Sequence, residues 1–149
     1  MAALNIFGAE NLEGRIDVAR VLGSAATAMY IYDLSPGESA CPYHYEYEEE
    51  WLLVVDGEIV LRTPDGERVL ERGDLVCFPP GAAGAHKVTN RSDAPARTMM
   101  FSNSRVPAVS VYPDSGKIGV WPGNEADDLV FRRESAVPWS DDEEDVGQT

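Results

Sequence analysis

Short stretches of alternating hydrophobic and polar residues make up most of the chain, and glycine or proline separates them about every 8–12 residues. This texture is typical of an antiparallel sandwich or barrel. The pattern predicts strands at about residues 27–34, 41–46, 50–55, 58–63, 67–71, 75–78, 86–90, 97–103 and 108–112. We therefore expect an all-β fold.

The 149 residues predict one domain with three parts. Residues 1–26 form an N-terminal arm, in which only residues 12–22 carry a weak helical pattern. Residues 27–123 form the barrel, with residues 112–123 as an ordered arm folded over it. Residues 124–149 form an acidic C-terminal tail that we expect to be partly disordered.

The net charge of −14 comes from 26 acidic and 12 basic residues. This balance excludes nucleic acid as a partner, because its backbone demands a basic surface, and it also excludes anionic membranes. No apolar run is long enough to span a membrane, and no secretory signal is visible. Cys41 and Cys77 do not form a CxxC pair, so we expect reduced thiols in a cytoplasmic protein.

Both histidines of the chain lie in stretches that also hold candidate metal ligands. His44 and Glu46 share one face of a predicted strand, because alternate residues point the same way. Glu50 would lie about 20 Å from His44 along one straight strand, so the chain must turn at residues 47–49 to bring the two together. His86 follows a stiff Pro-Pro-Gly corner and is aimed at the mouth of the barrel.

Two histidines and a carboxylate from different strands leave coordination positions free for a substrate. Such a set suits Fe(II) chemistry and also accepts other divalent ions. We therefore predict a metal site at His44, Glu50 and His86, with Glu46 as a fourth metal ligand, as a catalytic base, or as a group that supports a ligand. Cys41 has the opposite parity to His44, which argues against a thiolate ligand.

Two blocks of the sequence, residues 37–57 and 73–90, resemble the paired motifs of the cupin superfamily. The matching positions are Gly37, His44, Glu50, Gly57, Gly73, Pro79, Gly81, His86 and Asn90. The flanking residues are similar to a branch of single-domain bacterial cupins whose members mostly lack an assigned reaction. The resemblance implies a double-stranded β-helix, which is a jelly-roll barrel with its site inside, often as a homodimer.

One chemical departure from the family pattern stands at Glu46, where the cupin motif has a second histidine. A set of two histidines and two glutamates would place two negative charges on the ion and favour a harder metal. The cofactor we expect is a divalent ion, with iron, manganese, nickel, copper and zinc all open, and a barrel that binds no metal is the remaining alternative.

The first functional hypothesis is a metal-binding cupin that acts on a small carbonyl, carboxylate or sugar-like molecule as a dioxygenase, decarboxylase or isomerase. The alternative is a non-catalytic barrel that binds or senses a small molecule. A sugar-phosphate isomerase is a third reading, and it requires cationic side chains around the phosphate. Arg62 and Arg97 are the candidates for that role.

Overall fold

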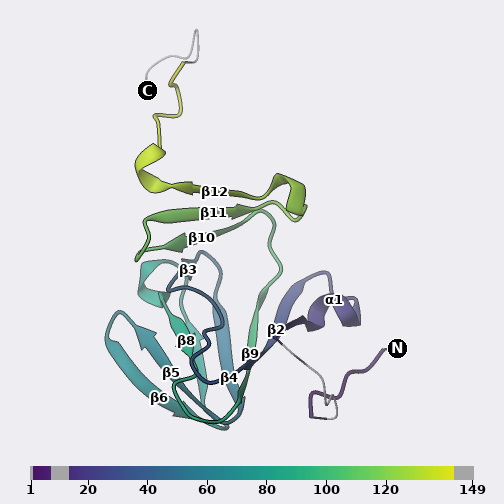
Figure 1. Cartoon of the computed structure of the whole chain (residues 1–149). Helices are drawn as coiled ribbons and strands as arrows, with labels where there is room; N and C mark the ends of the chain where they lie inside the picture. The colour runs from purple at the N-terminus through teal and green to yellow at the C-terminus, as the bar shows by residue number, and fades with distance from the viewer. Residues whose placement is uncertain (1, 8–13, 143–149) are drawn as a thin grey trace.

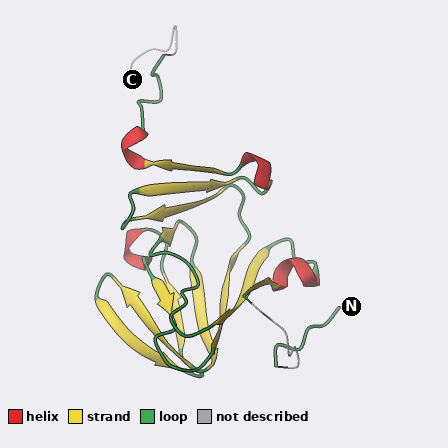
Figure 2. Ribbon diagram, viewed as in Figure 1, coloured by secondary structure: helices red, strands yellow, loops and turns green. Residues whose placement is uncertain are grey.

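The structure is a computed structural model that describes residues 2–7 and 14–142 (Figure 1). Almost all of its regular structure is antiparallel β-sheet, as predicted (Figure 2). A five-stranded sheet has the order β1 (Arg15–Asp17), β2 (Thr27–Leu34), β9 (Ala96–Asn103), β4 (Glu50–Asp56), β7 (Leu75–Phe78). A three-stranded sheet has the order β6 (Gly66–Glu71), β5 (Glu58–Thr63), β8 (Lys87–Thr89).

A third sheet has the order β12 (Leu129–Arg132), β11 (Lys117–Trp121), β10 (Ala108–Tyr112), β3 (Tyr45–Glu46). It lies across one end of the other two sheets (Figure 1). The helical segments are all short: α1 (Val18–Leu22), η1 (Ala82–Gly84), η2 (Glu125–Asp127) and η3 (Arg133–Ser135). None of the helices within the described residues is long and apolar enough to cross a membrane.

The core lies between the five-stranded and the three-stranded sheet. Leu52 and Val54 of β4 face Ile59 and Leu61 of β5, and all four side chains are fully buried together with Val88 of β8. Every second residue of β4 and β5 therefore points into the barrel, which is the period of two that the sequence shows. Burial of these branched side chains closes the two sheets into a barrel.

Asn90 holds the end of β8 to its surroundings through a fully buried amide. Its Nδ2 donates to the carbonyl oxygens of Leu34 and Ala94, both at 2.8 Å, and its Oδ1 accepts from Ser92. We expect Asn90→Ala to lower the free energy of unfolding by about 3 kcal/mol, because it leaves buried carbonyls without donors. Urea unfolding followed by tryptophan fluorescence measures this loss, and Ser92→Ala is the milder control. An equal effect of the two variants would contradict the prediction.

The N-terminal part of the chain differs from the expected helix at residues 12–22. Residues 8–13 lie outside the described residues, and residues 15–17 form strand β1, which pairs with β2. The helix begins only at Val18, because the Asp17 side chain accepts a hydrogen bond from the Arg20 backbone N–H at 2.9 Å and caps it. Gly23 ends it with a φ of 78°.

The stretch expected as an arm over the barrel, residues 112–123, is part of a hairpin. Residues 117–121 form β11, which pairs with β10 on one side and with β12 on the other. Strand β12 falls within the expected acidic tail, where a short apolar run (Leu129–Phe131) lies between two aspartates and two arginines. The partial disorder expected within residues 124–149 stays a prediction, and residues 143–149 lie outside the described residues.

Two apolar surfaces of this single chain are exposed. On the outer face of the five-stranded sheet, Trp51 is paired with Phe101, and both side chains are more than a third exposed. Strand β12 forms a sheet edge, and Leu129 and Val130 expose more than half of their surface. The homodimer stays a prediction: light scattering should return twice the 16.3 kDa of one chain, and a monomeric mass would contradict it.

Candidate metal centre

Three predicted ligands from separate segments meet at one point in the barrel. Glu50 is the first residue of β4, and its register with Ser102 places it on the inner face of the sheet. His44 and His86 are joined by two backbone hydrogen bonds, of 3.1 and 2.8 Å, just before β3 and β8. Their ligand atoms and a carboxylate oxygen of Glu50 all lie within 4.8 Å of one another. The turn that the spacing demands at residues 47–49 separates β3 from β4.

Both imidazoles are held in the same tautomer by backbone carbonyls. His44 Nδ1 lies 3.0 Å from the Pro42 oxygen, and His86 Nδ1 lies 2.9 Å from the Gly84 oxygen. A carbonyl only accepts, so each Nδ1 carries the hydrogen and donates it. In the neutral form of each ring, the Nε2 lone pair is therefore free for a metal.

Ring stacking fixes the orientation of the two histidines. Phe78 stacks on His86 with 3.7 Å between the ring centroids and 9° between the planes. Tyr112 of β10 stacks on His44 at 6.0 Å and 26°. Burial lowers the pKa of His44, and the neighbouring His86 lowers it further, so the neutral imidazole is favoured.

Two buried atoms of this cluster have no hydrogen-bond partner among the described residues. They are His86 Nε2 and Glu50 Oε2, and they lie 3.2 Å apart. In a neutral ring with its hydrogen on Nδ1, a nitrogen lone pair faces a carboxylate lone pair across this contact, which is an ion pair only when the ring is protonated. A divalent cation bound about 2 Å from each atom would satisfy both. The donor set therefore fits a metal such as iron, manganese, nickel, copper or zinc.

Glu46 lies beside this cluster but outside the set of three converging residues. Its Oε1 accepts a hydrogen bond of 2.8 Å from the Ser110 hydroxyl of β10. The indole N–H of Trp121 on β11 in turn donates to that hydroxyl at 2.9 Å. Burial raises the pKa of Glu46, and the Ser110 hydrogen bond opposes that rise. The third sheet thus holds Glu46 in place, which strand parity alone cannot predict.

Cys41 lies close to the site without matching the chemistry of a ligand. Its sulfur is 3.4 Å from His44 Nδ1, which is the nitrogen that faces away from the metal position. Burial, and then the charges of Glu50 and Glu46, raise the pKa of the Cys41 thiol to about 12. Without a metal ion, the protonated thiol is therefore favoured at neutral pH.

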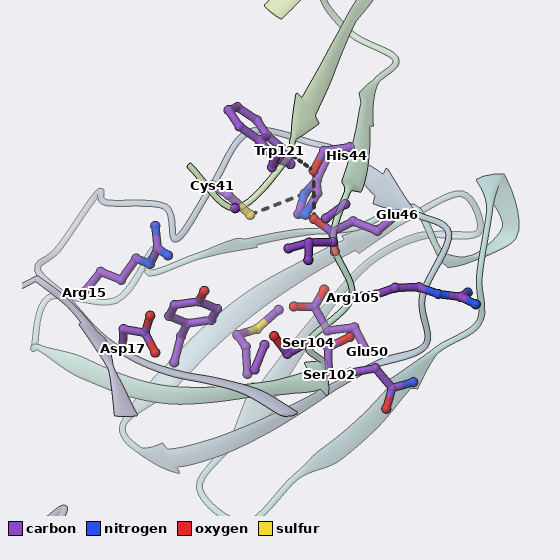
Figure 3. Close-up of a pocket in the computed structure, with 18 of the residues that line it drawn as sticks. Arg15, Asp17, Cys41, His44, Glu46, Glu50, Ser102, Ser104, Arg105 and Trp121 are labelled. Carbon is purple, nitrogen blue, oxygen red and sulfur yellow. Dashed lines mark hydrogen bonds between the residues drawn. The ribbon is translucent and has the colours of Figure 1, made fainter. Parts of the chain in front are cut away.

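A cavity of about 990 Å³ opens beside the cluster, which is large enough for a small organic molecule (Figure 3). His44, Glu46 and Glu50 lie on one side of it, and Tyr30 and Tyr32 of β2 form part of its floor. Arg15 and Asp17 of β1 and Arg20 of α1 also line it. Most of these lining residues are polar or aromatic, so the cavity suits an oxygen-rich molecule.

The arginines at this cavity are not those predicted. Arg62 pairs with Asp114 at 2.6 Å and lies over the Tyr43 ring, while Arg97 pairs with Asp33. Neither arginine is among the residues that line the cavity. In β5, Leu61 points into the core, so the adjacent Arg62 points the other way. The cavity is lined instead by Arg15, Arg20 and Arg105.

Comparison with known proteins gives the same fold. The cupin domain family model matches residues 30–102. Tetracenomycin polyketide synthase protein TcmJ of Streptomyces glaucescens is 26% identical over 90 residues, which cover 60% of this chain and 56% of that protein. The matched part of the chain thus spans little more than half the length of this curated relative.

Solved structures extend the similarity over most of the chain. A sugar phosphate isomerase of the cupin superfamily from Silicibacter pomeroyi has a TM-score of 0.74 at 25% identity, covering 86% of this chain and 82% of that one. The polyketide cyclase RemF of Streptomyces resistomycificus has a TM-score of 0.58 at 16% identity, covering 70% and 80%, and shows the fold alone. With the double-stranded β-helix and the paired motifs in place, the chain belongs to the cupin superfamily.

Proposed function

We propose that this cupin is a metal-dependent enzyme that moves a proton next to the carbonyl group of a small, oxygen-rich molecule, as an aldose–ketose isomerase does. The observation that carries this proposal is the position of Glu46. Its carboxylate is fixed by Ser110 at the edge of the His44, Glu50 and His86 cluster and lines the same cavity. A carboxylate beside a metal, but not consumed as its ligand, is placed to act as a base.

We propose separate roles in metal binding and in proton transfer for the residues of this site. His44, Glu50 and His86 would hold the ion, which would supply a positive charge to the oxygens of an adjacent carbonyl and hydroxyl. Glu46 takes the proton from the carbon that carries the hydroxyl and returns it to the former carbonyl carbon. The hydroxyl proton moves to the former carbonyl oxygen, so the product is an isomer of the substrate and no co-reactant is needed. The Silicibacter pomeroyi neighbour, named a sugar phosphate isomerase, supports this reaction class.

Proton exchange in D₂O tests the proposal directly. The protein is stripped with EDTA, reloaded separately with Mn²⁺, Fe²⁺, Ni²⁺, Cu²⁺ or Zn²⁺, and incubated with ribose 5-phosphate or fructose 6-phosphate. NMR should show deuterium entering next to the carbonyl with at least one ion and not with the stripped protein. Binding without exchange under every ion would favour the non-catalytic alternative. Oxygen uptake or CO₂ release without exchange would favour a dioxygenase or a decarboxylase.

A further inference from the structure

Arg15 lies on the same sheet face as the metal ligand Glu50, at the far side of the cavity. It pairs with Tyr32 of β2, and the register continues from Tyr32 to Thr98 of β9 and from Thr98 to Val54 of β4. Cross-strand partners share a face, and Glu50 has the parity of Val54. Arg15 therefore belongs to the face that carries Glu50, and Figure 3 shows the two residues across the cavity from each other.

The guanidinium of Arg15 is positioned by an aromatic ring. Its central carbon lies 4.1 Å from the centroid of the Tyr30 ring, and both residues line the cavity. The positive charge of Arg15 acts on Tyr32, another residue that lines the cavity. Burial raises the pKa of Tyr32, and Arg15 opposes that rise. A stacked guanidinium keeps its N–H fork free for an anion.

Arg15 and Arg20 differ from the paired arginines of the barrel. Arg62, Arg91 and Arg97 each have a carboxylate partner, whereas no carboxylate of the described residues lies within 4.0 Å of the Arg15 or Arg20 guanidinium. Arg105, the third arginine at the cavity, pairs weakly with Glu48 at 3.9 Å and points away from Glu50 (Figure 3). The cavity is also lined by acidic residues, so Arg15 and Arg20 offer an anion a local positive charge rather than an overall one; these acids are Asp17, Glu46, Glu50, Glu125 and Asp128.

The distance across the sheet sets the size of the bound molecule. From β1 to β4 the sheet crosses three strand spacings, which is roughly 14 Å between backbones, and Glu50 lies a further four residues, roughly 13 Å, along β4 from Val54, the residue level with Arg15. The Arg15 and Glu50 side chains extend into this span from its two ends, and the remaining space accepts a chain of several carbon atoms.

We propose that Arg15, assisted by Arg20, binds the phosphate of a phosphorylated sugar-like substrate and places its other end at the His44, Glu50 and His86 cluster. This inference rests on the proposed function for the reaction at that end, but phosphate binding itself does not depend on it. Guanidinium groups bind phosphate through paired N–H donors, and two of them balance its double charge. The phosphate would hold the substrate in one orientation.

Phosphate binding to the metal-stripped protein tests the inference without any catalysis. We expect titration calorimetry with inorganic phosphate and with ribose 5-phosphate to show at least 10-fold weaker binding for Arg15→Gln. Arg15→Lys keeps the positive charge but loses the paired N–H donors, so its affinity for phosphate should fall between that of the parent and that of Arg15→Gln. Arg62→Gln is the matched control, because it removes an arginine outside the cavity, and it should bind as the parent does. Circular dichroism confirms that each variant is folded.

The outcomes separate this inference from the proposed function. Equal phosphate affinity of Arg15→Gln and the parent would overturn the role of Arg15, whatever the exchange assay shows. Tighter binding of ribonate, which carries a carboxylate, than of ribose 5-phosphate would overturn the choice of phosphate. Arg15-dependent phosphate binding in a protein that never catalyses exchange would uphold the subsite and contradict the proposed function.

Discussion

We expect His86→Ala to abolish the tight binding of one divalent metal ion per chain. The substitution removes one of three converging donors and leaves Glu50 and His44 to hold the ion alone. Loss of a group that merely orients a ligand typically weakens metal binding about 10–100-fold, so loss of a donor should exceed about 100-fold. Elemental mass spectrometry of untagged protein and calorimetric titration of stripped protein with Mn²⁺ or Zn²⁺ measure the effect.

Glu46→Gln is the matched control for this experiment, because it changes a carboxylate at the same site outside the set of three. If Glu46 is the base, this variant keeps its metal, and if Glu46 is a fourth ligand, it loses affinity as His86→Ala does. Thermal unfolding gives an independent readout: added metal should raise the midpoint of the parent and leave that of His86→Ala unchanged. A stripped parent that takes up none of the ions would show that the cluster is no metal centre.

The geometry of the centre could be predicted from the sequence to the extent that it depends on strand parity. Alternation placed His44 and Glu46 on one face, and the distance to Glu50 required a turn at residues 47–49, which the structure has between β3 and β4. Parity gives only the face of a strand, however. Whether Glu46 turns to the ion or away from it depends on Ser110 and Trp121, which are more than 60 residues away in the sequence.

The arginines of the cavity were missed for a similar reason. Strand β1 has three residues, too few for alternation to be recognised, and only its pairing with β2 places Arg15 on the sheet face that borders the cavity. Arg62 lies in a clearly predicted strand, but its neighbours Ile59 and Leu61 take the inner face. Strand β12 was missed because its apolar run is only three residues long and lies between charged residues, so that its strand structure depends on pairing with β11.

The second large effect is expected for catalysis in Glu46→Gln. The glutamine keeps the size of the side chain and can still accept from Ser110, but it cannot take up a proton. We expect the rate of deuterium exchange to fall about 10²–10⁴-fold, the usual contribution of a positioned base, while metal content and phosphate affinity stay at the level of the parent. The D₂O assay with the metal-loaded protein measures the rate.

Two graded variants show whether the position of the Glu46 carboxylate matters as well as its presence. Ser110→Ala removes the hydrogen bond that holds Oε1, and Trp121→Phe keeps a ring but removes the indole N–H that orients the Ser110 hydroxyl. Because Glu46 stays in both, the exchange rate should fall less than in Glu46→Gln, and less in Trp121→Phe than in Ser110→Ala. A Glu46→Gln protein that retains metal and exchanges at the parental rate would contradict the assignment of Glu46 as the base. The proton would then have to be accepted by another group in the cavity.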